Sequence, residues 1–311
     1  MIGRLFALSV LLLGISDSQI LSMDQLVRNG DRIVFLGDSN TFAGNYVSDI
    51  DVLLKSSSRK VEVVNLGLPS ETCCGLSEPD HPFPRPTVQE RLDRVLAKTN
   101  PNVVVACYGM NDGIYHPFSQ KRFLAYQEGV LKLVEKVRKC GAKLVLLTPP
   151  PFDPLPMKAK NKLVDKASGK FAWFLIYEDY DSVLEKYSNW ILTLKGQVDA
   201  VVDIRTPILH FLDSQRQRDP KFTMSGDGVH FNATCHRQIA KALIKCLVPN
   251  EKLEVDESVV KLSQAKMEIL RDAWLTETRH QRPGMKTGLA LPEAMARGRK
   301  IDQQIQARLQ R

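Results

Sequence analysis

Short runs of apolar, often β-branched residues recur along the chain, and most are continuous rather than alternating with polar residues. Strands of a parallel sheet, which are buried on both faces, have this composition. We therefore predict strands over residues 32–36, 61–66, 102–108, 142–149 and 198–204.

The segments between these strands have apolar residues at helical spacing. The helix predicted over residues 122–140 ends in basic residues followed by Gly141, which is a common C-terminal signal. Alternating strands and helices predict a parallel sheet with right-handed crossovers, that is, a three-layer α/β/α sandwich. The other predicted helices cover residues 87–99, 179–195 and 233–248.

The N-terminus has the features of a secretory signal peptide in the expected order. Arg4 precedes an apolar run over residues 5–15, and the small residues Ser16 and Ser18 follow. The run is too short to be a permanent membrane anchor, and a buried N-terminal helix is the alternative. We predict a signal peptide over residues 1–18, a secreted or periplasmic protein, and no membrane span after its removal.

The rest of the 311 residues is predicted to form one domain over residues 19–248 and a basic, helical extension over 249–311. The extension either packs against the core or binds a partner. The net charge of +8 is not gathered into a Lys/Arg stripe with interleaved aromatic residues, so no nucleic-acid partner is expected. The six cysteines form no CxxC pair, and no HExxH motif occurs, so no metal or cofactor is predicted. Neither the state of the adjacent Cys73 and Cys74 nor the oligomeric state follows from the sequence.

The first candidate for chemistry is Ser39, in the sequence GDSN over residues 37–40. It directly follows the first predicted strand, and ligands of parallel sheets bind at the carboxyl ends of strands. A helix is expected to begin just after it, so free N–H groups would face an anion there. The alternative is an ordinary turn or N-cap serine, which is far commoner than a nucleophile.

A serine nucleophile needs a base, an acid that orients the base, and donors for the oxyanion. His230 follows the fifth predicted strand, and Asp227 lies three residues earlier, a spacing that also suits a simple Asx turn. Asn111 follows the third strand and can donate through its amide, and the loop over residues 65–72 can offer a backbone N–H. These side chains all follow strands at one edge of one sheet, which predicts a serine hydrolase site.

The order of GDSN, NLGLPSE, GMND and DGVH over residues 32–248 resembles the four blocks of the SGNH hydrolases, also called GDSL-type esterases or lipases. The resemblance implies a flavodoxin-like sandwich with five parallel strands, no metal, and ester hydrolysis through an acyl-serine intermediate. It implies the residue roles as follows: nucleophile Ser39, catalytic Asp227 and His230, and oxyanion donors Ser39, Ser70 and Asn111.

Two positions depart from the family pattern. Ser70 stands where the family has a glycine that donates its backbone N–H, and Gly67 is the nearby alternative. Asn40 stands where leucine or isoleucine is frequent, and we expect it to be tolerated.

The surrounding loops are polar, apart from residues 171–180, which either line a pocket or pack. This favours a small acyl group, such as acetyl on a carbohydrate, over a long lipid chain. The alternatives are a lipase or lysophospholipase and an inactive family member that binds glycans or proteins.

Overall fold

A computed structural model describes residues 26–249 and 255–310, so the predicted signal peptide lies outside the described residues. All five predicted strands are present and form one parallel sheet in the order β2-β1-β3-β4-β7. This is the order of a flavodoxin-like doubly wound sheet. The strands are β1 (Arg32–Gly37), β2 (Glu62–Asn65), β3 (Val103–Cys107), β4 (Lys143–Leu147) and β7 (Ala200–Val202).

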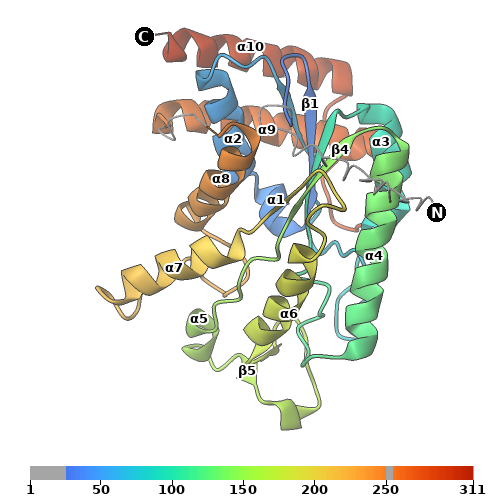
Figure 1. Ribbon diagram of the computed structural model, residues 1–311, viewed down its shortest axis with the longest axis vertical. Coiled ribbons are helices and arrows are strands. Elements are labelled where there is room, and N and C mark those ends of the chain that lie inside the picture. The colour runs from blue at the N-terminus through green and yellow to red at the C-terminus, as the bar shows by residue number, and fades with distance from the viewer. Residues whose placement is uncertain (1–25, 250–254, 311) are drawn as a thin grey trace, which may run out of the picture.

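Helices cover both faces of this sheet, as predicted (Figure 1). On one face α2 packs against α8, and on the other α3 packs against α4. The predicted end of α4 is confirmed, because Gly141 follows it with a φ of +82°. The helices are α1 (Ser39–Ala43), α2 (Asn45–Ser56), α3 (Val88–Thr99), α4 (Gln120–Lys139), α5 (Leu155–Lys158), α6 (Tyr180–Leu192), α7 (Arg205–Arg216), α8 (Ala233–Leu247), α9 (Glu257–Thr278) and α10 (Leu291–Leu309).

The core lies between the sheet and its helices, and the middle of β1, from Ile33 to Leu36, is fully buried. Residues 171–180 mainly pack, since Phe171 and Tyr180 are buried, although Trp173 remains 49% exposed. They include β6 (Ile176–Tyr177), which pairs with β5 (Leu163–Val164) in a second, two-stranded sheet. Within the described residues, no helix has the length and apolar character needed to cross a membrane.

The C-terminal extension is helical, as predicted, and α9 and α10 lie side by side across one end of the molecule (Figure 1). The buried carboxylate of Asp51 in α2 accepts hydrogen bonds from Lys266 Nζ and Ser263 Oγ in α9, both at 2.7 Å. Burial would raise the pKa of Asp51, but the charges of Lys266 and Lys55 lower it below its usual value. An ionised group and an apolar contact of Val52 thus hold the extension against the sandwich.

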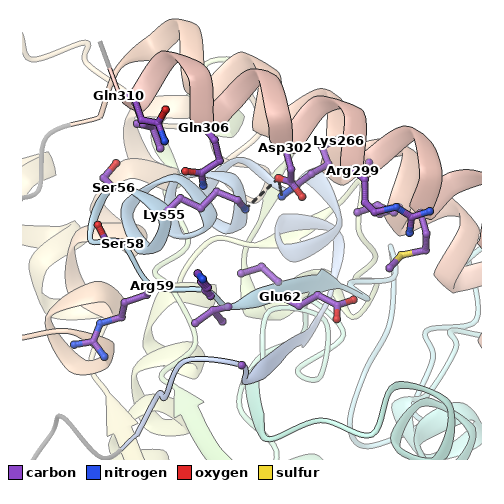
Figure 2. Close-up of a pocket in the computed structure, with 18 residues that line it drawn as sticks. Lys55, Ser56, Ser58, Arg59, Glu62, Lys266, Arg299, Asp302, Gln306 and Gln310 are labelled. Carbon is purple, nitrogen blue, oxygen red and sulfur yellow. Dashed lines mark hydrogen bonds and ion pairs between the residues drawn. The ribbon is translucent and has the colours of Figure 1, made fainter.

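A pocket of about 690 Å³ lies between α2, the start of β2 and α10. Figure 2 shows Lys55 and Lys266 pointing toward Asp302 of α10, with Nζ–Oδ1 distances of 3.3 and 2.9 Å. Glu62, the first residue of β2, lines the pocket, which places it at the amino-terminal edge of the strands. The pocket therefore lies at the amino-terminal ends of the strands, whereas Ser39 lies at their carboxyl ends.

Candidate active site

The candidates Ser39 and Asn111 lie just beyond the carboxyl ends of β1 and β3, which are neighbours in the sheet. The chain leaves β1 toward β2 on one side and later returns to β3 on the other side. This is the switch point at which doubly wound sheets bind their ligands. The sheet topology thus brings together two residues that are far apart in the sequence.

Ser39 is the first residue of the short helix α1, and it is partly exposed between the buried residues Asp38 and Asn40. Asp38 caps the helix, because its Oδ1 accepts the Asn40 N–H at 2.9 Å. Burial raises the pKa of this capping carboxyl to about 6. No described residue accepts a hydrogen bond from the Ser39 N–H, so that group can donate to an oxyanion.

Asp227 and His230 form the predicted pair, with His230 Nδ1 2.7 Å from Asp227 Oδ2. Asp227 Oδ1 also accepts the backbone N–H groups of Val229 and His230, at 3.0 and 2.8 Å, so the Asx-type turn is present as well. Burial would raise the pKa of Asp227, but these hydrogen bonds lower it below its usual range. With Nδ1 engaged, Nε2 is the imidazole nitrogen left to act on a substrate or on Ser39.

Asn40 joins the turn that carries Ser39 to the loop that carries His230. Its buried side chain donates from Nδ2 to Val229 O at 3.0 Å and accepts the Phe231 N–H on Oδ1 at 3.1 Å. Val229 and Phe231 flank His230, so one amide sets the separation between the turn of Ser39 and the imidazole. The sequence alone indicates only that Asn40 is a tolerated departure from the family pattern and does not reveal this role. The one signal was a polar residue at a position where apolar residues are frequent.

No hydrogen bond joins Ser39 Oγ to His230 within the part of the chain that the structure describes. Catalytic hydrogen bonds often form fully only when the substrate binds. The charge of Asp38, next to Ser39, contributes to the raised pKa of His230 after the larger effect of the Asp227 hydrogen bond. The imidazole therefore lies close enough to the turn of Ser39 to interact electrostatically with Asp38.

The raised pKa of His230 predicts a pH dependence. A general base must be neutral to accept a proton, so kcat/KM should rise with pH through a midpoint above 6.5, the ordinary value for histidine. Asp227→Asn removes the carboxylate whose hydrogen bond and charge raise this pKa, so the midpoint should move down toward the ordinary value while the rate falls. Profiles of kcat/KM over about pH 5–9 for both proteins measure this. A wild-type midpoint at or below 6.5 would contradict it.

Asn111 is held so that one amide N–H remains available. Its Oδ1 accepts the Tyr115 hydroxyl at 2.9 Å, and its Nδ2 donates to Glu71 O at 3.1 Å. An amide nitrogen carries two N–H groups, so the second can donate to a developing oxyanion. The role of Tyr115 is likewise not evident from the sequence, because a tyrosine four residues after an asparagine forms no recognisable pattern.

The two candidates for the second-block donor differ in geometry. The Gly67 N–H already donates to Asn65 Oδ1 at 2.9 Å, and a Cβ at Gly67 would lie 2.2 Å from the backbone N of Phe42. Gly67 therefore serves the close approach of two chain segments. Ser70 has a φ of +67°, a backbone conformation natural for glycine, and its N–H donates to no described residue. Ser70 is thus the candidate whose N–H is available.

This difference predicts opposite outcomes for two single substitutions. Ser70→Gly should keep kcat within about twofold, because it preserves the N–H and suits the positive φ. Gly67→Ala should cost about 1–3 kcal/mol of stability, because the new methyl group has no space. Ester hydrolysis and thermal unfolding of both variants measure these effects. A loss of kcat of about 100-fold in Ser70→Gly would show that the hydroxyl, not the backbone N–H, is the functional group.

A buried ion pair lies beneath the loop that carries Ser70. Arg91 of α3 contacts Glu71 through two hydrogen bonds of 2.6 and 2.7 Å and also donates to Leu66 O at 2.7 Å. Tyr108 adds a hydroxyl donor to Glu71 Oε2 at 2.6 Å. Both charged side chains are fully buried. The loop is therefore fixed at both ends by one guanidinium group.

Asp112 fixes the backbone of the two adjacent cysteines. Its Oδ1 accepts the backbone N–H groups of Cys73 and Cys74, at 2.7 and 2.9 Å, which ties the segment just after the second block to the third block. Burial raises the pKa of Asp112 to about 6. All six cysteines lie in the described ranges and none is in a disulfide.

Among residues 26–249 and 255–310, no cluster of histidine, cysteine and carboxylate side chains could hold a metal ion. The arrangement suits nucleophilic catalysis. A serine, a carboxylate-paired imidazole and three N–H donors lie in loops at the carboxyl end of one sheet.

Comparison with solved structures supports the fold. The chain is similar to an acetyl-xylooligosaccharide esterase from Geobacillus, with 16% identity over 75% of this chain and 100% of that one, at a TM-score of 0.54. It is also similar to the acetyl xylan esterase AlAXEase, with 20% identity over 70% of this chain and 100% of that one, at a TM-score of 0.51.

A gut microbial diltiazem-metabolizing enzyme is a third similar structure, with 21% identity over 72% of this chain and a TM-score of 0.52. This chain covers 49% of that enzyme, about half of its length. No curated protein matches the chain.

The sequence profile of the GDSL-like lipase/acylhydrolase family matches residues 35–238, which is more than half of the chain and includes all four motif blocks. The protein therefore belongs to the GDSL-like lipase/acylhydrolase (SGNH) family.

Proposed function

We propose that the protein is a serine esterase that hydrolyses carboxylic esters through an acyl-serine intermediate. The observation that carries this proposal is the Asn40 amide, which ties the loop of the Asp227–His230 pair to the turn of Ser39. A binding protein has no need for a carboxylate-paired imidazole near a partly exposed serine at the switch point of its sheet.

In the proposed reaction, Ser39 Oγ attacks the ester carbonyl while His230 Nε2 accepts its proton. The negative oxygen of the tetrahedral intermediate accepts hydrogen bonds from the N–H groups of Ser39 and Ser70 and from Asn111 Nδ2. The intermediate collapses, the alcohol leaves with the proton from His230, and an acyl-serine remains. Water activated by the same imidazole then releases the acid.

We further propose a small acyl group, such as acetyl, on a carbohydrate. Charged pairs tie together the loops near the site. Arg85 and Glu78 form a buried pair at 2.6 Å, and Lys170 reaches Asp80 at 3.5 Å. A long-chain lipase would need an extended apolar groove instead. Two of the similar structures are, by name, acetyl esterases of xylan or its oligosaccharides, which is consistent with this substrate class.

An active-serine phosphonate probe tests the proposal together with a panel of esters. The full chain should be labelled at Ser39, located by peptide mass analysis, and should hydrolyse p-nitrophenyl acetate and acetylated xylo-oligosaccharide faster than p-nitrophenyl palmitate. Preference for palmitate would replace the acetyl proposal with a lipase. Absence of both labelling and hydrolysis would overturn the proposal that the protein is an enzyme. The remaining alternative would be a family member that binds glycans or proteins.

A further inference from the structure

Two arginines of the C-terminal extension reach the candidate active site, although the family match ends at residue 238. Arg271 lies on α9, and Arg282 lies on the segment between α9 and α10. We propose that these arginines are positioning residues: Arg271 fixes the helix that presents Ser39, and Arg282 aims the Ser70 N–H into the oxyanion hole. This inference rests on the proposed esterase function.

Arg271 holds the far end of α1. Its Nη1 donates to Phe42 O at 2.8 Å, and its guanidinium carbon lies 3.7 Å from the centroid of the Phe42 ring. The last carbonyls of any helix have no partner within the helix, and a helix as short as α1 cannot hold its own shape. Phe42 is three residues after Ser39, so a contact that fixes Phe42 also fixes the direction of the nucleophile.

The guanidinium of Arg271 is itself held in place. Its Nε donates to Asp272 Oδ1 at 2.9 Å, and the side chain is buried. A planar group that is fixed by a carboxylate, a carbonyl and an aromatic ring can take only one orientation. Lysine, a point charge on a flexible stem, cannot make these three contacts together.

Arg282 acts on the oxyanion loop through one peptide unit. Its Nε donates to Pro69 O at 2.9 Å, and its guanidinium carbon lies 5.0 Å from the centroid of the Phe83 ring. The Pro69 carbonyl and the Ser70 N–H belong to the same planar peptide, so they point in opposite directions. When Arg282 holds the Pro69 oxygen toward the extension, the Ser70 N–H is therefore held in the opposite direction, toward the proposed position of the substrate. A cation on the carbonyl oxygen also polarises the peptide and makes its N–H a stronger donor.

The packing of the extension does not by itself require these contacts. Lys266, Ser263 and an apolar cluster around Val52 already attach α9 and α10 to α2, away from Ser39. Arg271 and Arg282 instead contact the two segments that carry Ser39 and Ser70. The extension thus makes two kinds of contact, one for attachment and one for the site.

The test uses the full chain with Arg282→Ala and Arg271→Lys, and p-nitrophenyl acetate as substrate. Loss of the orienting contact should lower kcat about tenfold or more in each variant, with KM changed by less than about threefold, because the oxyanion donor acts in the transition state. Added ethylguanidinium should restore part of the kcat of Arg282→Ala. Arg297→Ala is the matched control, because Arg297 lies on α10 in an exposed pair with Glu293, and its kcat should equal that of the wild type.

The outcomes separate the inference from the proposed function. A wild-type chain that hydrolyses no ester overturns both. Wild-type activity with unchanged kcat in Arg282→Ala and Arg271→Lys overturns the inference alone. A fall of kcat that follows a fall of Tm and is not restored by ethylguanidinium also overturns it, because the arginines would then only stabilise the fold.

Discussion

Replacing Ser39 by alanine is expected to lower kcat for ester hydrolysis by about four orders of magnitude or more. Without Oγ no acyl-serine can form, and only the oxyanion donors and substrate binding remain to accelerate the attack of water. The same substitution should leave Tm nearly unchanged, because the side chain of Ser39 makes no hydrogen bond among the described residues and is partly exposed. Steady-state kinetics and thermal unfolding of the purified full chain measure both quantities.

A second substitution shows whether Ser39 and His230 act as one unit. His230→Ala should cause a loss of similar size, and the double variant should be no worse than either single variant, because residues of one nucleophilic unit are not additive. Ser56→Ala, beside the pocket at the other edge of the sheet, is the control and should keep full activity. Additive losses from Ser39 and His230, or turnover by Ser39→Ala near the wild-type rate, would contradict the proposed mechanism.

The largest expected effect on stability comes from the buried pair of Glu71 and Arg91. Glu71→Ala should lower the free energy of unfolding by about 3–5 kcal/mol, because it leaves the Arg91 charge uncompensated in the core. The Tyr108 hydroxyl would lose its acceptor as well. Since the same network holds Leu66 O and the loop of Ser70, kcat should fall even at temperatures where the variant is folded. Chemical denaturation and kinetics well below Tm measure the two effects.

An exposed ion pair and a double variant serve as controls for this prediction. Glu293→Ala removes an exposed partner of Arg297 and should change stability by less than about 1 kcal/mol. Glu71→Gln combined with Arg91→Met removes both buried charges and should be more stable than Glu71→Ala. If Glu71→Ala were no more destabilising than Glu293→Ala, the network would not be what anchors the loop.

Much of the fold could be predicted because its elements are encoded locally. The five strands are continuous apolar runs, and this signal requires only that a strand be buried on both faces. The sequence pattern does not by itself predict the helices α2 and α7, which are both present in the structure. The amphipathic pattern of α2 is weak, because its buried face includes the polar residues Ser48, Asp49 and Asp51. Asp49 and Asp51 pair with Arg237 and Lys266, which lie on distant segments of the chain.

Part of the candidate site also follows from the sequence, because its motifs are local and sit at the ends of predicted strands. Ser39 and Asn111 follow strands, and the carboxyl ends of parallel strands share an edge, so local pattern and sheet geometry together bring them near each other. Asp227 and His230 are close in sequence and pair across one turn. Asn40 and Tyr115 were not predictable, because their hydrogen-bond partners are set by packing.

The sequence by itself thus determined the alternating α/β order, the motif blocks and the candidate residues of the site. Only the tertiary structure decided which N–H of the second block is available, since the Gly67 N–H is already taken by Asn65 while Ser70 adopts a positive φ. It also decided that the extension reaches the site, through Arg271 on Phe42 and Arg282 on Pro69. The physical reason is the separation of the interacting residues along the chain. Strand and helix patterns depend on near neighbours, whereas a hydrogen bond between segments more than 200 residues apart forms only when the chain has packed.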